Sequence, residues 1–239
     1  MVMRCVVVPD YQGQEASHGT LSRAVSAVLP DAVTVAAVNG VDVLSATAPE
    51  VDVCFASPGF NRPVLAGLSR ALDIGADEIA RVDDNEHPMD LLPYAFDQLD
   101  AADVVVLDTA FDAATLTPGS GEEYHTRWVI PETIRAATDG RLALSGAHGF
   151  MAFRASALAV VLPVALSALS RAEDAARRLH RPDVIWSVDG LLVVIAVRQG
   201  LRVAVHPRRA TAQRANPPEK SVAQLRDLLA LVRALDTLA

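Results

Sequence analysis

The stretch Arg4-Cys5-Val6-Val7-Val8 near the N-terminus decides the fold class. Its residues after Arg4 are all apolar, and such a run is typical of a central strand that is covered on both faces. Pro9 is expected to end this strand, because proline cannot donate a hydrogen bond to a neighbouring strand. Similar short apolar runs recur along the chain and alternate with helical patterns. The alternation predicts an α/β fold with a mostly parallel central sheet flanked by helices.

The other elements follow from the same two periodicities. Further strands are expected at residues 32–38, 51–56, 79–82, 103–108, 150–153 and 201–205, and helices at residues 20–28, 62–72, 89–99 and 188–199. The apolar stretch 155–170, which contains Pro163, is expected to form a packed helix pair, since about 20 residues are needed to span a bilayer. Ser221 and Gln224 predict a capping box for an amphipathic terminal helix, preceded by a flexible Pro/Arg-rich loop at residues 207–220.

Composition narrows the class of protein. The 239 residues are 51% hydrophobic, which suits one large α/β domain with a sizeable core. The formal net charge of −8 excludes a general affinity for nucleic acid. The two cysteines, Cys5 and Cys54, lie in strand-like runs and are expected to be free thiols. With no signal-peptide pattern at the N-terminus, we expect a cytoplasmic protein with at most peripheral membrane contact.

An acidic run follows the predicted strand at residues 79–82. Asp83, Asp84 and Glu86 stand within four positions of one another. Carboxylates gathered at one strand end repel each other unless a cation or solvent neutralises them. Mg²⁺ and Mn²⁺ prefer such oxygen ligands and are often shared with substrate phosphates. The run therefore predicts a metal site, with a solvated turn, in which Asp84 or Asn85 caps the next helix, as the alternative.

Several segments occur in the order of a known set of motifs. Residues 6–11 (VVVPDY) resemble a VVIPAYNE opening, Asn61-Arg62 with Ala66-Gly67 resembles an N-x-G…A…G stretch, and residues 75–88 (GADEIARVDDNEHP) resemble GDYVLFLDADLQHP. Residues 146–154 (GAHGFMAFR) look like an acceptor-side G…FR segment, and Asp189 stands at the spacing of an E-D motif ahead of residues 200–203 (GLRV). In this order the segments resemble the family 2 glycosyltransferases of the GT-A (Rossmann-like) fold, in particular their polyprenyl-phosphate mannosyl- and glucosyltransferase branch.

The resemblance implies roles for the residues that match. Those placed at the nucleotide-sugar donor are Pro9, Asp10, Tyr11, Asn61, Arg62, Asp83, Asp84 and Arg209. Asp83 and Asp84 would hold a Mg²⁺ or Mn²⁺ ion that bridges the donor diphosphate. Asn85 is the alternative to Asp84 as the second ligand of the motif. It also implies one GT-A domain in which residues 1–108 form the nucleotide-sugar half, residues 109–206 a smaller acceptor-side half, and residues 207–239 the basic loop and terminal helix.

Three candidate residues have two possible roles each. Asp189 matches the carboxylate that activates the acceptor, and it can equally cap the following helix. His206 ends the last predicted strand and is either a third metal ligand or an ordinary strand-end histidine. Arg209 either closes over the donor phosphates through charge-assisted hydrogen bonds or belongs to a solvated basic loop.

The sequence thus predicts a metal-dependent glycosyltransferase. It would transfer a sugar from a UDP- or GDP-linked donor to a hydroxyl or phosphate of a small-molecule or lipid-phosphate acceptor. A catalytically degenerate nucleotide-binding module is one alternative, because residues 83–85 read D-D-N in place of D-x-D and Val188 replaces a glutamate. A sugar-1-phosphate nucleotidyltransferase is the other, although residues 9–14 lack the Gly-rich basic loop that it needs. Homo-oligomerisation stays open.

Overall fold

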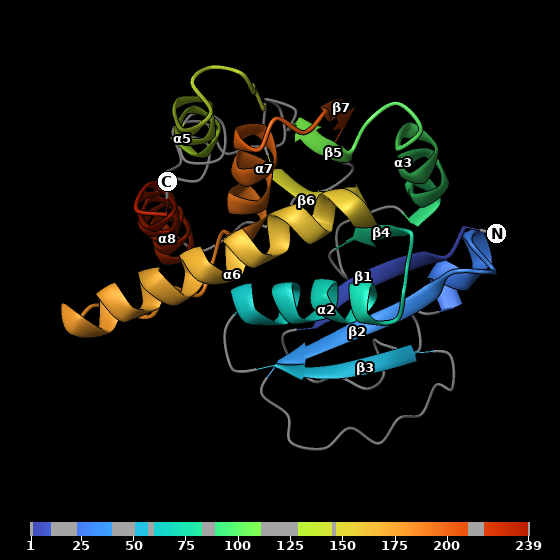
Figure 1. Cartoon of the computed structure of the whole chain (residues 1–239), viewed down its shortest axis with the longest axis horizontal. Coiled ribbons are helices and arrows are strands. Elements are labelled where there is room, and N and C mark those ends of the chain that lie inside the picture. The colour runs from blue at the N-terminus through green and yellow to red at the C-terminus, as the bar shows by residue number, and fades with distance from the viewer. Residues whose placement is uncertain are drawn as a thin grey trace.

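The computed structural model describes residues 2–10, 23–39, 51–56, 60–82, 89–110, 129–144, 147–209 and 218–238. Its strands are β1 (Arg4–Asp10), β2 (Val33–Asn39), β3 (Val51–Ala56), β4 (Glu78–Arg81), β5 (Val104–Ala110), β6 (Ala147–Arg154) and β7 (Val203–Arg209). Its helices are α2 (Asn61–Asp73), the 3-10 turn η1 (Met89–Leu91), α3 (Leu92–Gln98), α5 (Ile130–Ala137), α6 (Ala155–Arg178), α7 (Val188–Arg198) and α8 (Pro218–Asp236) (Figure 1). Residues 23–28 are also helical.

The described strands form a single sheet in the order β3-β2-β1-β4-β6-β5-β7. β1 pairs in parallel with β2 and β4, and β5 pairs in parallel with β7, so the expected mostly parallel sheet is confirmed. β6 runs antiparallel to both β4 and β5, which the sequence patterns did not indicate. The carboxyl ends of six strands and the amino end of β6 therefore lie along one side, which we call the carboxyl edge.

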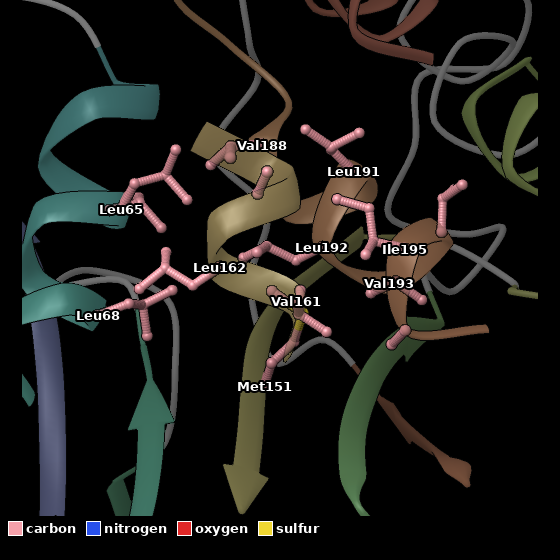
Figure 2. Packing of buried hydrophobic residues seen from close by; sticks show 14 of the residues in the cluster. Leu65, Leu68, Met151, Val161, Leu162, Val188, Leu191, Leu192, Val193 and Ile195 are labelled. Carbon is pink, nitrogen blue, oxygen red and sulfur yellow. The ribbon is translucent and has the colours of Figure 1, made fainter. Parts of the chain in front are cut away.

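Each face of the sheet carries its own core, because successive side chains of a strand point to opposite faces. On one face, residues such as Cys5 and Val7 pack against α2, α5, α6, α7 and α8. On the other face, residues such as Val6 and Val8 pack against α3 and the 23–28 helix. Figure 2 shows part of the first core, with side chains of α2, α6 and α7 meeting above Met151 of β6.

Helix α2 lies unusually close to the sheet, and a glycine makes this possible. A Cβ placed on Gly67 would stand 2.5 Å from Cγ1 of Val7 and 3.0 Å from Cβ of Ala37. Both neighbours belong to buried strands, β1 and β2. The missing side chain therefore sets the distance between α2 and the strands beneath it.

The stretch after β6 forms one helix, and the expected helix pair is wrong. α6 is a continuous helix of 24 residues that includes Pro163. Pro163 and Ala159 are both exposed, so water is available to the carbonyl group that the proline leaves without an amide donor. Among the described residues, α6 is the one helix long and apolar enough to cross a membrane by length and composition, which corrects the expectation from length. It also lies beside α2 and α8 in the core (Figure 1).

Two strands extend through prolines that were expected to end them. β1 continues through Pro9 to Asp10, and β7 continues through Pro207 to Arg209. The Val7 carbonyl accepts from the Val82 amide, so the backbone of Pro9, two residues on, faces the region beyond the end of β4. Pro207 lies on an edge strand, where one side needs no hydrogen bonds. Residues 207–209 are therefore strand and not loop.

The C-terminal helix is present as expected, but its start differs. α8 begins at Pro218, a residue type favoured in a first helical turn. Ser221 therefore lies inside the helix, and the capping box predicted at Ser221 and Gln224 is wrong. α5 was not expected, because its eight residues are too few for a clear helical period.

Candidate functional site

Several of the predicted site residues lie along the carboxyl edge. Pro9 lies near the end of β1. β4 ends at Arg81, and the next residue, Val82, is the last one described before the acidic run. His206 lies in the middle of β7 and does not end the strand as predicted, because β7 continues to Arg209. Asp189 lies at the start of α7. Tyr11, Asp83, Asp84 and Asn85 fall outside the described residues, as do the side chains of Asp10 and Arg209. Their predicted contacts stay predictions.

A buried ion pair lies just below this edge. Arg81, the last residue of β4, has no solvent-exposed side-chain surface, and its Nη2 lies 3.1 Å from Oδ2 of Asp189. Its Nη1 donates to the carbonyl of Gly149 in β6, and its guanidinium carbon lies 5.3 Å from the centre of the Phe60 ring. One side chain thereby joins β4 to β6, α7 and the start of α2.

Arg81 was not among the site residues predicted from the sequence. The residue stands in the apolar run 79–82 (IARV), where a charged side chain is costly unless a partner neutralises it. A charged residue in an apolar strand was therefore the one sign in the sequence that Arg81 has a buried partner. The required partner, Asp189, stands 108 positions later in the chain, so no local pattern identifies it.

Asp189 has a defined position in the structure. It lies in the first turn of α7, and the N-cap is Ser187, so the alternative of Asp189 as the helix cap is wrong. The Asp189 side chain is 13% exposed and faces Arg81. A guanidinium that holds a carboxylate in this way fixes its orientation at the edge of the sheet. The role of general base stays a prediction.

The segment that leads into α7 is held by the last helix. The backbone amides of Ile185 and Trp186 donate to Oδ2 of Asp227, at 2.9 and 3.1 Å. The Ser187 hydroxyl donates to the Gln224 carbonyl at 2.7 Å, and Ser187 adopts a left-handed φ of 74°. Burial raises the pKa of Asp227, against the opposing effect of its hydrogen bonds to Arg226 and the two amides. α8 thus fixes the backbone that precedes Asp189.

Asn61 connects the same segment to α2. Its side-chain amide donates to the Val184 carbonyl at 3.2 Å, and its carbonyl oxygen accepts from the Val188 amide at 2.9 Å. The residue is 1% exposed, so its two polar atoms are engaged within the fold. The Ile185 carbonyl accepts from the amides of Phe60 and Asn61, which caps the start of α2. Asn61 therefore has a structural role in the fold, and its predicted contact with the nucleotide-sugar stays a prediction.

Arg62 lies at the surface beside a small cavity. Its guanidinium forms two hydrogen bonds with Glu173 of α6, and 46% of its side chain is exposed. The cavity holds about 190 Å³ and is lined by Asn61, Arg62, Glu173, Arg177, Asp183, Val184 and Ile185. Both charge signs line it, so it shows no preference for an anionic or a cationic ligand. The predicted donor contact of Arg62 stays a prediction.

His206 pairs with Tyr94 of α3, on the same face of the sheet. Its Nδ1 lies 2.8 Å from the Tyr94 hydroxyl, and the two rings meet edge to face with centroids 5.4 Å apart. Its Nε2 is buried and has no hydrogen-bond partner within the described part of the chain. A neutral imidazole nitrogen with a free lone pair is a common metal ligand. The residue therefore fits a metal ion at the carboxyl edge.

The remaining ligands for such an ion would come from the acidic run. Among the residues that the structure describes, no group of three or more His, Cys, Asp or Glu side chains could hold a metal on its own. Residues 83–85 follow Val82 in the sequence, and Val82 lies at the same edge of the sheet as His206. Aspartate and asparagine oxygens together with one imidazole form a set of ligands that suits Mn²⁺. Mg²⁺ prefers a set with more oxygen and less nitrogen.

The sheet order, the single reversed strand and the flanking helices define a GT-A, Rossmann-like α/β fold, as the sequence predicted. Solved structures with this fold include glucosyl-3-phosphoglycerate synthase from Mycobacterium tuberculosis in complex with Mn²⁺, UDP and glucosyl-3-phosphoglycerate. That structure superposes with a TM-score of 0.64 and 18% identity, over 98% of this chain and 80% of that chain.

Two further solved structures are similar to this chain in fold. The M. tuberculosis synthase with Mn²⁺, UDP-glucose and phosphoglyceric acid has a TM-score of 0.60 and 16% identity, over 98% of this chain and 80% of that chain. A structure described as a mycobacterial protein has a TM-score of 0.65 and 18% identity, over 98% and 75%. No family model and no curated protein matches the sequence. At these identities the similarity establishes the fold.

Proposed function

We propose that this protein is a metal-dependent glycosyltransferase that takes its sugar from a nucleotide-diphosphate donor. The observation that carries the proposal is the position of His206, whose buried Nε2 lies without a hydrogen-bond partner among the described residues, at the edge where the acidic run follows β4. Solved structures with this fold contain Mn²⁺ together with UDP or UDP-glucose, which supports a divalent metal and a UDP-sugar donor here.

The proposal assigns the metal, the nucleotide and the phosphates to different residues of the chain. His206 and the oxygens of Asp83 and either Asp84 or Asn85 would hold the ion, which supplies a positive charge that stabilises the leaving diphosphate. Pro9 and Asp10, at the end of β1, and Tyr11, the next residue in the sequence, would line the nucleotide pocket. Arg209, at the end of β7, would add a charge-assisted contact to the phosphates. Arg81 holds the Asp189 carboxylate toward the same edge.

The acceptor is proposed to carry a phosphate group. Phosphoglyceric acid and glycerol 3-phosphate occupy the structures of the synthase with Mn²⁺ and UDP-glucose, which supports a small phosphate-bearing acceptor. Asp189 would orient the acceptor or accept its proton. A lipid-phosphate acceptor, as in the polyprenyl-phosphate branch of family 2, is the finer alternative, as is Mg²⁺ in place of Mn²⁺. We also propose a cytoplasmic location and the division into a donor half (1–108) and an acceptor half (109–206).

A nucleotide titration with and without metal tests the proposal. The melting temperature is expected to rise by several degrees with UDP and Mn²⁺ together, since a ligand at 100 times its Kd contributes about 2.7 kcal/mol. Asp83→Ala with Asp84→Ala should abolish this rise. Asp97→Ala, which removes an exposed carboxylate on α3, is the matched control and should preserve it. An equal rise in the absence of metal would contradict the assigned metal role.

A nucleotide-binding module without turnover is the second candidate. One observation favours it: Asp189, the predicted general base, is ion-paired with a fully buried arginine. Metal-dependent hydrolysis of UDP-glucose, measured as UDP release with purified protein, separates the two. Release that depends on Asp83 and Asp84 supports the transferase, whereas tight UDP binding without release across a panel of phosphate-bearing acceptors supports the module.

A further inference from the structure

We infer that Tyr94 is a positioning residue that holds His206 in the tautomer with its lone pair on Nε2. The inference rests on the proposed function for the identity of the ligand, a divalent metal ion. The tautomer itself is a property of the metal-free protein and can be measured there.

The contact joins two elements that the chain brings together from far apart. Tyr94 lies on α3 and His206 on β7, 112 positions later, and β7 is the edge strand next to β5. His206 pairs in register with Leu107, which belongs to the core beneath α3, so His206 faces the same side of the sheet as α3. The hydroxyl lies 2.8 Å from Nδ1, and the rings meet at 84°, so both the distance and the ring angle are defined.

The position of the single ring proton follows from what surrounds each nitrogen. A neutral imidazole carries one N–H and one lone pair. If the proton is on Nε2, a buried N–H lacks an acceptor among the described residues. If the proton is on Nδ1, it donates to the Tyr94 oxygen. Tyr94 is 42% exposed, so its own hydroxyl proton can be donated to water. The second arrangement satisfies every donor.

This arrangement is the one that a metal ligand requires. Histidines that bind metals almost always donate their other ring N–H to an oxygen, which fixes the tautomer and the orientation of the ring. Here the tyrosine oxygen takes that place. The hydrogen bond thereby prepares Nε2 to donate its lone pair to an ion without a proton shift on binding.

Nitrogen NMR on the metal-free protein tests the tautomer directly. Long-range ¹H–¹⁵N spectra of ¹⁵N-histidine-labelled protein, at a pH where the rings are neutral, distinguish Nδ1–H from Nε2–H, and His206→Gln assigns the signals. The wild type is expected to show Nδ1–H at His206. Tyr94→Phe, which keeps the ring and removes the oxygen, should convert a large share to Nε2–H. An Nε2–H tautomer in the wild type, or an unchanged spectrum in Tyr94→Phe, would overturn the inference.

Calorimetric titration of Mn²⁺ in the presence of UDP gives a second readout. Tyr94→Phe is expected to weaken Mn²⁺ binding about 10- to 100-fold, the usual effect of removing such an outer partner. Thr237→Val, which removes a hydroxyl that donates within the end of α8, is the control and should bind Mn²⁺ as the wild type does. Wild-type Mn²⁺ affinity in Tyr94→Phe would overturn the inference.

The two possible failures are distinguishable. If His206→Gln binds Mn²⁺ as tightly as the wild type, the metal role in the proposed function fails, whatever the tautomer. If His206→Gln loses the ion while Tyr94→Phe keeps both its affinity and its tautomer, the proposed function stands and the inference about Tyr94 is wrong. The melting temperature of each metal-free variant shows whether a loss of affinity comes from a loss of fold.

Discussion

At the scale of single residues, the carboxyl edge depends most on Arg81. Its side chain is fully buried and satisfies a carboxylate on α7 and a carbonyl on β6 at the same time. A buried ion pair contributes little compared with well-packed apolar groups, but removal of one partner leaves an uncompensated charge. Arg81 is therefore costly to lose.

Arg81→Met is expected to destabilise the protein by roughly 3 to 5 kcal/mol, because it leaves Asp189 buried without its guanidinium. Urea unfolding measures the loss. The double variant Arg81→Met with Asp189→Leu should regain part of it, since both charges are then absent. The control is Arg62→Met, which removes the half-exposed partner of Glu173 and should cost about 1 kcal/mol or less. A loss as small as that of the control would contradict the importance of the buried pair.

The pair between Asp103 and Arg202 gives a pH-dependent effect. Hydrogen bonds from the Arg202 side chain and backbone amide hold the pKa of Asp103 below 3.8, the value for an unperturbed aspartate. A carboxylate with a lowered pKa in the folded state stabilises that state above pH 3.8, and the contribution is lost as the pH falls through the folded pKa. Asp103→Asn should therefore be less stable than the wild type near neutral pH. Unfolding measured from pH 7 to pH 2 should show this difference shrinking below about pH 4.

At the scale of elements, local patterns predicted most strands and helices but not how they meet. Apolar runs located β1 to β5, and helical spacing of apolar residues located α2, α3 and α7. The direction of β6 and the continuity of α6 through Pro163 depend on neighbouring elements, so no local pattern contains them. The same division holds for the site. Asp189 and His206 stand in recognisable positions of the sequence, whereas Arg81 and Tyr94 matter through contacts with residues far along the chain.

The contact between α2 and the sheet can be tested at Gly67. Gly67→Ala is expected to destabilise the protein by about 1 to 3 kcal/mol, because the new Cβ would overlap Val7 and the strand cannot retreat from a packed core. This outcome is the opposite of the effect of alanine in an exposed helix, where it would stabilise by about 1 kcal/mol. Thermal and urea unfolding measure the change. Ser69→Ala on the same helix is the control, and a stabilised Gly67→Ala would show that α2 is free to move outward.

At the scale of the whole molecule, the last helix holds the segment that carries the predicted catalytic carboxylate. Asp227 of α8 accepts from two amides just before α7, and Asn61 of α2 bonds to the same segment from the other side. Trp186 stacks on Phe60, whose ring in turn contacts Arg81. The start of α2, the end of β4, α7 and α8 are thus joined at one place.

Asp227→Ala is expected to cost roughly 2 to 4 kcal/mol, since two amides lose their acceptor. Hydrogen exchange should accelerate at Ile185 and Trp186, and Asp227→Asn, which keeps an oxygen, should lose less. The pKa of Asp227 is raised, so its proton adds stability that is fully present below pH 3.8 and is lost as the pH rises through the folded pKa. Unchanged exchange at both amides in Asp227→Ala would refute the role of α8.

The reversed strand β6 has a consequence for how such proteins diversify. It enters the sheet at the carboxyl edge and leaves at the far side, whereas its neighbours do the reverse. The segment before it can therefore lengthen, shorten or change in composition while the register of the parallel strands stays intact. Under the proposed transferase function, gene duplicates with this architecture would have a position where new acceptors can be acquired without rebuilding the part that receives the donor.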